Sequence, residues 1–463
     1  MSEAVNNSYC LETELIYKQY HINKNELKLV QSKDFVVLPF RTSSINTDIK
    51  QISKIVSACF RNTLNIKDIE LKNSEELIDE IAQTVTTDDK KVFKHLLTSL
   101  YVEENQLIKF HPRMFVYGGK SSSGIKNIAN YLTNNLFSNN IDEALSGIIT
   151  SEANVVIEEL IMEHTPLAIP QSAEKKTVDF CLIPEIREMF EKDLLFLCTS
   201  QKKFLDNVEK LITFYLFFIT SQTILALRRG FDDNESNIQN VFYFLDWEKV
   251  SRSRTGYQQG WKMIEKRSEN IFAYVNLLQI LNMTKNRNFK GSFADISCAL
   301  SELSEFEMSE FKKDVVEINN KILSIIGYDR QGKVKKSISK EYDCLNELLQ
   351  TLIDAKDKGN RRVAPAYERY QKNIKSIAAL GLLKARGQLG NTLNLNQEWI
   401  IFLTRLCIGE RDKIRLNELW EELAKRGVNF DKYSREMIIS YFEKINILEK
   451  KSDSGDAQYV RVL

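Results

Sequence analysis

Apolar residues recur every three or four positions over long stretches in the middle of the chain. The pattern runs through residues 184–218, 257–281 and 339–358. This spacing is typical of helices that bury one face. No proline lies between Pro184 and Pro365, so nothing of that kind forces a helix to end in the interval. The sequence therefore predicts that residues 151–395 form an all-α body with long helices.

The first third of the chain has a less regular pattern. Residues 34–40 and 113–119 are short apolar runs that predict strands, whereas residues 49–60 and 74–85 have the period of helices. We therefore expect residues 1–150 to form a mixed, mostly helical N-terminal region.

Residues 396–463 have the most complete pattern of elements. The sequence predicts a helix from Gln397, a strand at 413–415, a helix from Leu416, a turn at Gly427, a helix over 432–445, and two closing strands at 447–450 and 458–462. This is the element order of a winged helix-turn-helix domain. The predicted fold is thus mainly α: an elongated multi-helix body, a mixed N-terminal region and a C-terminal winged helix-turn-helix domain.

Composition and charge add a local signal to this picture. The chain is 43% hydrophobic and 27% charged, which is typical of a globular protein. The net charge of +1 gives no strong field over the whole molecule. From Arg361 onward, however, the chain carries 19 Lys or Arg against 13 Asp or Glu. The basic surplus therefore belongs to the last part of the chain.

One apolar segment is long enough to raise the question of a membrane span. Residues 211–227 are apolar but are interrupted by Thr213 and by the polar run 220–223. These interruptions and the 17-residue length favour a buried helix over a span. The N-terminus lacks the basic-then-apolar order of a signal peptide, so we expect a cytoplasmic protein.

The third helix predicted within residues 396–463 carries candidates for DNA contact. In a winged helix this helix can enter the major groove, while the closing hairpin touches the backbone. The candidates are Lys432, Tyr433, Arg435, Ser440, Lys450, Lys451 and Arg461. Basic side chains suit phosphate groups because they displace condensed counterions. Glu436 and Glu443 lie on the same helix, so docking of a protein partner is an equal alternative.

Two further stretches combine basic and aromatic residues. Between residues 359 and 393 the basic candidates for nucleic-acid contact are Arg361, Arg362, Lys384 and Arg386. Their alternative is a solvated helix face. Between residues 244 and 261 the candidates for a partner interface are Trp247, Arg252, Arg254, Tyr257 and Trp261. Here the favoured interpretation is structural, with tryptophans in the core and a loop between two helices.

Catalytic motifs are weak in this sequence. The segment 116–124, VYGGKSSSG, lacks the first glycine of a phosphate-binding loop and is better interpreted as a glycine-rich turn. The seven cysteines and four histidines are scattered without zinc-ligand spacing, which predicts reduced thiols and no such metal site. We expect no cofactor and no enzyme activity. A metal-dependent nuclease site assembled from distant carboxylates is the enzymatic alternative.

Four segments resemble the DptG family, a subunit of the bacterial DNA phosphorothioation-dependent restriction system. They are FYFLDWEKVSRSRTGYQQGWK (242–262), KARGQLGNTLNLNQEWIIFLT (384–404), IRLNELWEELAKRGVNFDKYS (414–434) and KKSDSGDAQYVRVL (450–463). The likeness covers most of the second half of the chain. It transfers no catalytic residue, because the roles of these motifs in the family are poorly defined.

The resemblance implies a role in antiviral defence, in a complex that attacks DNA lacking backbone sulfur. It also implies DptF-like and DptH-like partners, which carry the ATPase and helicase motifs. We therefore expect a non-catalytic subunit that bridges these partners and contacts double-stranded DNA. A pure protein scaffold, whose winged helix docks a partner, is the main alternative. A transcriptional regulator is a further one.

Overall fold

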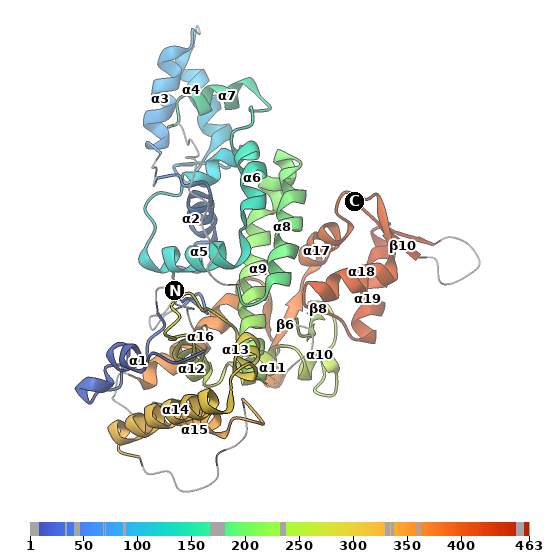
Figure 1. The fold of residues 1–463 in the computed structure, drawn as a ribbon. Coiled ribbons are helices and arrows are strands. Elements are labelled where there is room, and N and C mark those ends of the chain that lie inside the picture. The colour runs from blue at the N-terminus through green and yellow to red at the C-terminus, as the bar shows by residue number, and fades with distance from the viewer. Residues whose placement is uncertain are drawn as a thin grey trace, which may run out of the picture.

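The computed structural model of the chain is mostly α-helical (Figure 1). It describes residues 9–32, 35–40, 47–67, 69, 71–86, 89–166, 181–231, 238–328, 334, 338–358, 363–450 and 458–462. The strands within these ranges are short, at two to five residues each. The predicted mainly α class is therefore confirmed.

A long helix, α9 (Gln201–Arg229), runs through the centre of the molecule. Within the described part of the chain it alone is long and apolar enough to cross a membrane, yet 89% of its most apolar window is buried in the fold. Among its polar interruptions, Gln222 exchanges hydrogen bonds with the backbone of Gln239, and Thr213 and Ser221 donate to the carbonyls of Glu209 and Phe218, whereas the buried Thr220 hydroxyl has no partner among the described residues. The prediction of a buried helix is confirmed, and the structure is compatible with a soluble protein.

Helices α2 (Ile52–Leu64) and α8 (Pro184–Cys198) pack along α9. Helices α5 (Ser123–Leu136) and α6 (Asp142–Ile149) pack against α2 and α8. The 3-10 turn η2 (Pro112–Val116) precedes α5, and a second one, η3 (Asn139–Ile141), connects α5 to α6. Helix α8 begins with Pro184, whose fixed φ and missing N–H suit a first helical turn.

A small group of elements beyond these helices has a hydrophobic core of its own. We call it the distal lobe: α3 (Ser74–Thr84), α4 (Lys90–Tyr101), the hairpin β1 (Val102–Glu103) and β2 (Gln106–Leu107), and α7 (Val156–Glu163). Its buried core residues are Leu77, Ile78, Ile81, Leu97, Tyr101 and Ile161. Asn73 and Asp89 cap the first turns of α3 and α4 with their side chains.

The lower half of the molecule is a second helical group. It contains α10 (Thr255–Gln258), α11 (Trp261–Ser268), α12 (Ile271–Leu281), α13 (Phe293–Ser301), α14 (Glu305–Ile326), α15 (Asp343–Lys358) and α16 (Ala364–Ala378). Helix α12 is buried along its whole length and packs against α9, α15 and α16. The N-terminal α1 (Thr13–Gln19) and η1 (Ile22–Lys24) also lie here, where the Tyr9 hydroxyl donates to the Leu281 carbonyl.

The C-terminal unit, residues 396–463, contains the elements that the sequence predicts, within a few residues at their ends. They are α17 (Gln397–Ile408), β7 (Lys413–Arg415), α18 (Leu416–Lys425), α19 (Lys432–Lys444), β9 (Leu448–Lys450) and β10 (Gln458–Arg461). The short strand β8 (Val428–Asn429) was not predicted and lies where the sequence predicts a turn. An antiparallel sheet joins three of the strands in the order β7-β10-β9.

Two small parallel pairings join the C-terminal half of the chain to the central body. Strand β3 (Val241–Phe242) pairs with β8, and β4 (Phe244–Leu245) pairs with β6 (Asn391–Leu395). Strand β5 (Leu383–Ala385) lies antiparallel to β6, and the 3-10 turn η4 (Gly387–Leu389) connects the two strands. Residues 241–245 are thus hydrogen-bonded to two segments far along the chain.

Two strand predictions are wrong. Residues 113–119 are not extended, because residues 112–116 form η2, in which Phe115 and Val116 fill the core. Asp34 lies outside the described residues, and residues 35–40 contain no strand. There the Gln31 side chain donates to the Leu38 and Phe40 carbonyls and accepts from the Leu38 N–H. Its amide supplies the hydrogen bonds that a neighbouring strand would give.

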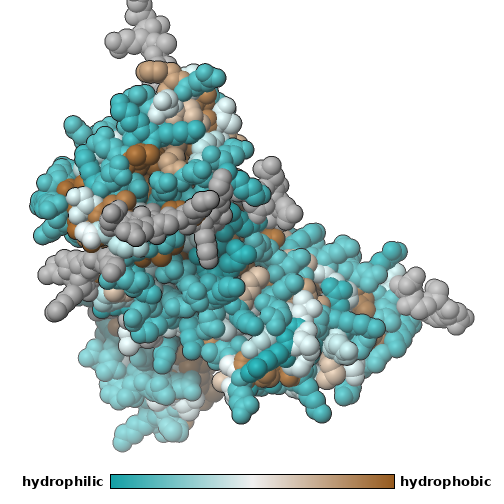
Figure 2. All heavy atoms as spheres, turned by 90° about the horizontal axis from the view of Figure 1, so that it is seen from below, coloured by the Kyte–Doolittle hydropathy of each residue, from teal (hydrophilic) through white to brown (hydrophobic). Residues whose placement is uncertain are grey.

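The surface agrees with a large buried core. The face of the molecule in Figure 2 is mostly hydrophilic, with small, scattered apolar patches. All seven cysteines are free thiols, as their spacing predicts.

Candidate nucleic-acid and partner interface

The outer face of α19 carries two of the predicted DNA-contacting residues in exposed positions. The Lys432 side chain is 87% exposed and Tyr433 is 65% exposed. Asp431 accepts a hydrogen bond from the Ser434 N–H and so fixes the first turn of the helix. Lys432 Nζ lies 4.0 Å from a carboxylate oxygen of Glu436, one turn along the same face. The cation therefore has an acidic neighbour.

Arg435 and Ser440 are less available. The Arg435 guanidinium lies over the Trp420 ring, 5.2 Å from its centroid, and so packs against α18. Ser440 is half-buried. Arg435 therefore belongs to the inner side of α19, whereas Ser440, seven residues after Tyr433, lies on the same side of the helix as that exposed tyrosine.

The cations near the closing hairpin are also paired. Lys450 Nζ lies 2.5 Å from Glu443, and Arg461 donates to the Asn446 carbonyl at 2.9 Å and lies 3.8 Å from Glu449. Lys451 lies outside the described residues. Exposed ion pairs of this kind contribute little to stability, but they lower the positive potential of the surface.

The upstream basic candidates are divided between undescribed and internal positions. Arg361 and Arg362 lie outside the described residues. Lys384 donates to the Asp246 carbonyl at 3.1 Å, and Arg386 donates to the Leu245 carbonyl at 3.0 Å. Both side chains therefore hold the end of β5 against the end of β4.

Two of the five candidates between residues 244 and 261, Trp247 and Arg254, contact the C-terminal unit. The Trp247 ring packs on Tyr441 of α19 at 5.4 Å, and Trp261 is buried. Arg252 is exposed and donates to the Gln388 carbonyl at 3.3 Å. Tyr257 is half-buried beside Lys262. The structural interpretation of this stretch is the one that these contacts support.

Arg254 lies at the junction between the body and the C-terminal unit. Its guanidinium donates to both oxygens of the Asp431 carboxylate, to Glu248 at 3.0 Å and to the Ser434 hydroxyl at 2.9 Å. Burial acts to raise the pKa of Asp431, but the hydrogen bonds from Arg254 and Ser434 outweigh it and hold that pKa below its usual value. The residue is an interface residue within the chain, and it anchors the first turn of α19.

A second buried network joins α18 to α8, and the sequence analysis did not find it. Arg426 is fully buried, and its guanidinium donates to both carboxylate oxygens of Asp193, at 2.5 and 2.9 Å. The Tyr215 hydroxyl donates to the same carboxylate at 2.7 Å, and Glu422 accepts from Arg426 at 3.1 Å. The charges of a buried pair compensate one another only when the hydrogen bonding is this complete.

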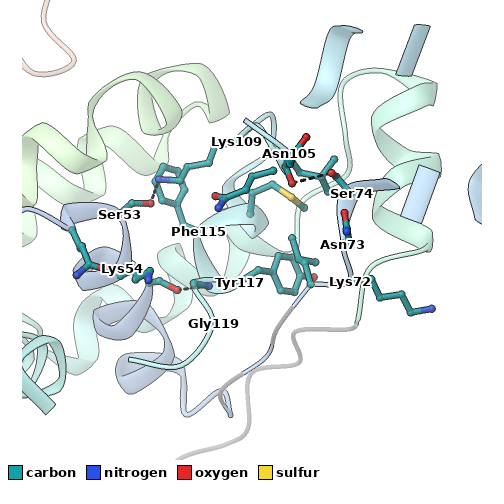
Figure 3. A pocket seen from close by; sticks show the side chains of 17 residues that line it. Ser53, Lys54, Lys72, Asn73, Ser74, Asn105, Lys109, Phe115, Tyr117 and Gly119 are labelled. Atoms are coloured by element: carbon teal, nitrogen blue, oxygen red, sulfur yellow. Dashed lines mark hydrogen bonds between the residues drawn. The ribbon is translucent and has the colours of Figure 1, made fainter. Parts of the chain in front are cut away.

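One further site contains the glycine-rich turn. A cleft of about 610 Å³ lies between the distal lobe and the body, and Figure 3 shows the side chains around it. Gly118 N–H donates to the Ser57 hydroxyl, and the Gly119 carbonyl accepts from Arg61. These contacts attach the loop to α2, which supports a structural turn over a phosphate-binding loop.

The cations of this cleft are largely committed. Lys72 pairs with Glu80 at 2.6 Å, and Lys109 pairs with Glu209. Nowhere in the described ranges do three or more His, Cys, Asp or Glu side chains gather as ligands for a metal ion.

Comparison with known proteins gives no identification, since no family model and no curated protein sequence matches the chain. The likeness to the DptG family therefore stays a prediction from the four segments quoted above.

Proposed function

We propose that the chain is a non-catalytic subunit of a cytoplasmic DNA phosphorothioation-dependent restriction complex. In this proposal it bridges DptF-like and DptH-like ATPase or helicase subunits and contacts double-stranded DNA. The observation that carries the DNA part is the arrangement of the C-terminal unit. Its element order and its β7-β10-β9 sheet match a winged helix-turn-helix domain, with α19 as the recognition helix and β9–β10 as the wing.

The attachment of α19 to the helical body supports an adaptor role. Recognition helices contact DNA mainly with residues near their N-terminal end, and here Lys432 and Tyr433 are exposed at that end. Asp431 and Ser434, in the same turn, are bound to Arg254 of the body. DNA on this face would therefore be held at a fixed angle to the helical body, where partner subunits can bind.

A second candidate function is protein docking by the same face. Three of the cations predicted to contact phosphate have a carboxylate within 4.0 Å. Lys432 pairs with Glu436, Lys450 with Glu443 and Arg461 with Glu449. Tyr433 and Met437 are exposed on α19 as well. A mosaic of paired charges around an aromatic residue suits a protein partner.

Duplex binding by the full-length chain separates the two candidates. Fluorescence anisotropy with a labelled duplex should show binding that weakens steeply as salt rises. The double variant Lys432→Gln/Lys450→Gln should bind more weakly and flatten the salt slope by about one per lost phosphate contact. Lys313→Gln is the matched control, because this lysine forms a similar exposed pair with Glu310 on the remote helix α14.

The absence of duplex binding at low salt would exclude DNA contact by the C-terminal unit. Capture of purified ATPase or helicase subunits by the wild-type chain, lost in Tyr433→Ala, would then support the docking function. The full-length chain is the suitable reagent for both measurements, because a fragment of residues 396–463 would separate Arg426 from Asp193.

A further inference from the structure

The outer face of α4 is an apolar stripe that the fold leaves exposed. Val92, Leu96 and Leu100 are 64%, 42% and 53% exposed and follow one another at intervals of four residues. Residues at this spacing lie in one line on a helix surface. The neighbouring face of α4 is already covered, since Leu97 and Tyr101 are buried in the core of the distal lobe. The helix is therefore apolar on two faces, and only one is covered.

Charges of opposite sign lie at the two ends of this stripe. Lys90 and Lys91 are exposed in the first turn of α4, and Glu103 and Glu104 are exposed just beyond its last turn. None of these four side chains has an ion-pair partner within the described part of the chain. Cations in a first turn oppose the helix macrodipole, so the lysines do not stabilise α4 itself. Their placement points to a partner outside the chain.

We propose that this face of α4 pairs antiparallel with the same face of a second copy of the chain. A two-fold axis near Leu96 sets Val92 of each copy opposite Leu100 of the other. The same axis brings Lys90 and Lys91 of each copy toward the exposed carboxylates of the other, at both ends. A single patch thus supplies both halves of the contact, as a two-fold symmetric interface requires.

The position of α4 agrees with such a pairing. The helix lies in the distal lobe, remote from the C-terminal unit (Figure 1). A dimer formed there leaves both copies of α19 free, so the assembly carries two C-terminal units.

The size of the stripe sets the strength of the dimer. The eight steps from Val92 to Leu100 correspond to about 12 Å of helix. One helix pair of this length buries less than the roughly 1,600 Å² of a standard interface. The dimer is therefore weak and dependent on concentration.

Sedimentation velocity of the full-length chain over a wide range of concentration tests the proposal. We expect reversible dimerisation, and we expect Leu96→Glu to weaken it at least about tenfold, because two carboxylates would meet at the axis. Leu96 is partly exposed, so this change leaves the core of the lobe intact. Leu195→Glu, at an exposed leucine on α8, is the matched control and should dimerise as the wild type does.

Charge reversal tests whether the partner that covers the α4 stripe is a second copy of the chain. Lys91→Glu and Glu103→Lys should each weaken the dimer, and the two changes in one chain should restore it, because each pair is then re-formed with reversed sign. A chain that stays monomeric at every concentration would overturn the proposal. So would a dimer that Leu96→Glu leaves unchanged, or a monomeric chain that uses the stripe to bind another protein or lipid vesicles.

Discussion

His111 illustrates how single polar residues are held in this fold. The side chain is fully buried, and its Nδ1 accepts a hydrogen bond from the Arg113 N–H at 3.0 Å. Nε2 lies 3.3 Å from both the Ser151 hydroxyl and the Gln201 amide. Burial, followed by the nearby charge of Arg113, lowers the pKa of His111 from 6.5 to about 4. The imidazole is thus neutral in the folded chain over a range in which an unfolded one is charged.

This residue predicts a loss of stability in acid. Below pH 6.5 the unfolded state binds a proton that the folded state does not accept until about pH 4, so stability falls across that window. The loss from His111 alone amounts to about 3 kcal/mol at pH 4. His111→Asn keeps a side-chain acceptor for the Arg113 N–H at the start of η2, and it should remove this part of the pH dependence. Urea unfolding of the wild type and of the variant at pH 6.5 and pH 4 measures the loss of unfolding free energy. Equal losses in the two proteins would show that His111 is not its source.

At the scale of elements, the approach of β8 to α9 depends on Gly427. Its φ is +68°, and a Cβ at this position would lie 2.5 Å from the Phe218 ring. Only glycine satisfies both the left-handed backbone and the short distance. Strand β8 then pairs with β3, so the residue also controls a contact between the body and the C-terminal unit.

Gly427→Ala should therefore be more destabilising than an alanine at an uncrowded left-handed glycine. Gly327, with φ of +62° at the end of α14, has nothing within 4 Å of its Cβ position. We expect Gly327→Ala to cost about 1 kcal/mol, and Gly427→Ala about 1–3 kcal/mol more because the Phe218 ring must move. Thermal unfolding of the two variants compares them, and equal costs would show that the contact with Phe218 is unimportant.

The local spacing of apolar residues predicted the helices and most of the strands of the C-terminal unit. It could not predict which segments far apart in the sequence pair with one another. Helices α17, α18 and α19 follow from their apolar period, and β9 and β10 from their alternation. The strand predicted at residues 113–119 failed because an apolar run of that length suits a buried 3-10 turn equally well. The pairing of β3 with β8 joins segments that carry no signal of each other in the sequence.

The candidate site divides in the same way. The chain pattern found Lys432 and Tyr433, which are exposed on α19. It could not find that Lys450 lies beside Glu443, because that pair depends on the hairpin packing against the helix. Asp193 offered a weak signal, as a charged residue on the apolar stripe between Phe190 and Leu197, but its partner lies 233 residues away.

At the scale of the whole molecule, Arg426 and Asp193 join the C-terminal unit to the body. Arg426→Ala should cost about 3–5 kcal/mol, because it leaves the Asp193 carboxylate buried without its counter-charge. Lys372→Ala removes an exposed pair with Glu368 and should cost less than about 1 kcal/mol. Chemical unfolding gives both values.

A double variant checks the cause of that loss. Adding Asp193→Asn to Arg426→Ala removes the orphaned charge and should recover part of the lost stability. No recovery would mean that the side-chain volume of Arg426, rather than its charge, holds the units together.

The 233 residues between Asp193 and Arg426 also bear on how the chain is made. At about 5–20 residues per second, a ribosome that has added Asp193 needs about 12–47 s more to reach Arg426. Residues up to Arg229 are made early in that interval, so for most of it α8 and α9 are complete but the Asp193 carboxylate that they enclose has no counter-ion. The helical body therefore reaches its final state only when the end of the chain emerges. Nascent chains stopped before residue 426 should be unusually sensitive to proteases and dependent on chaperones.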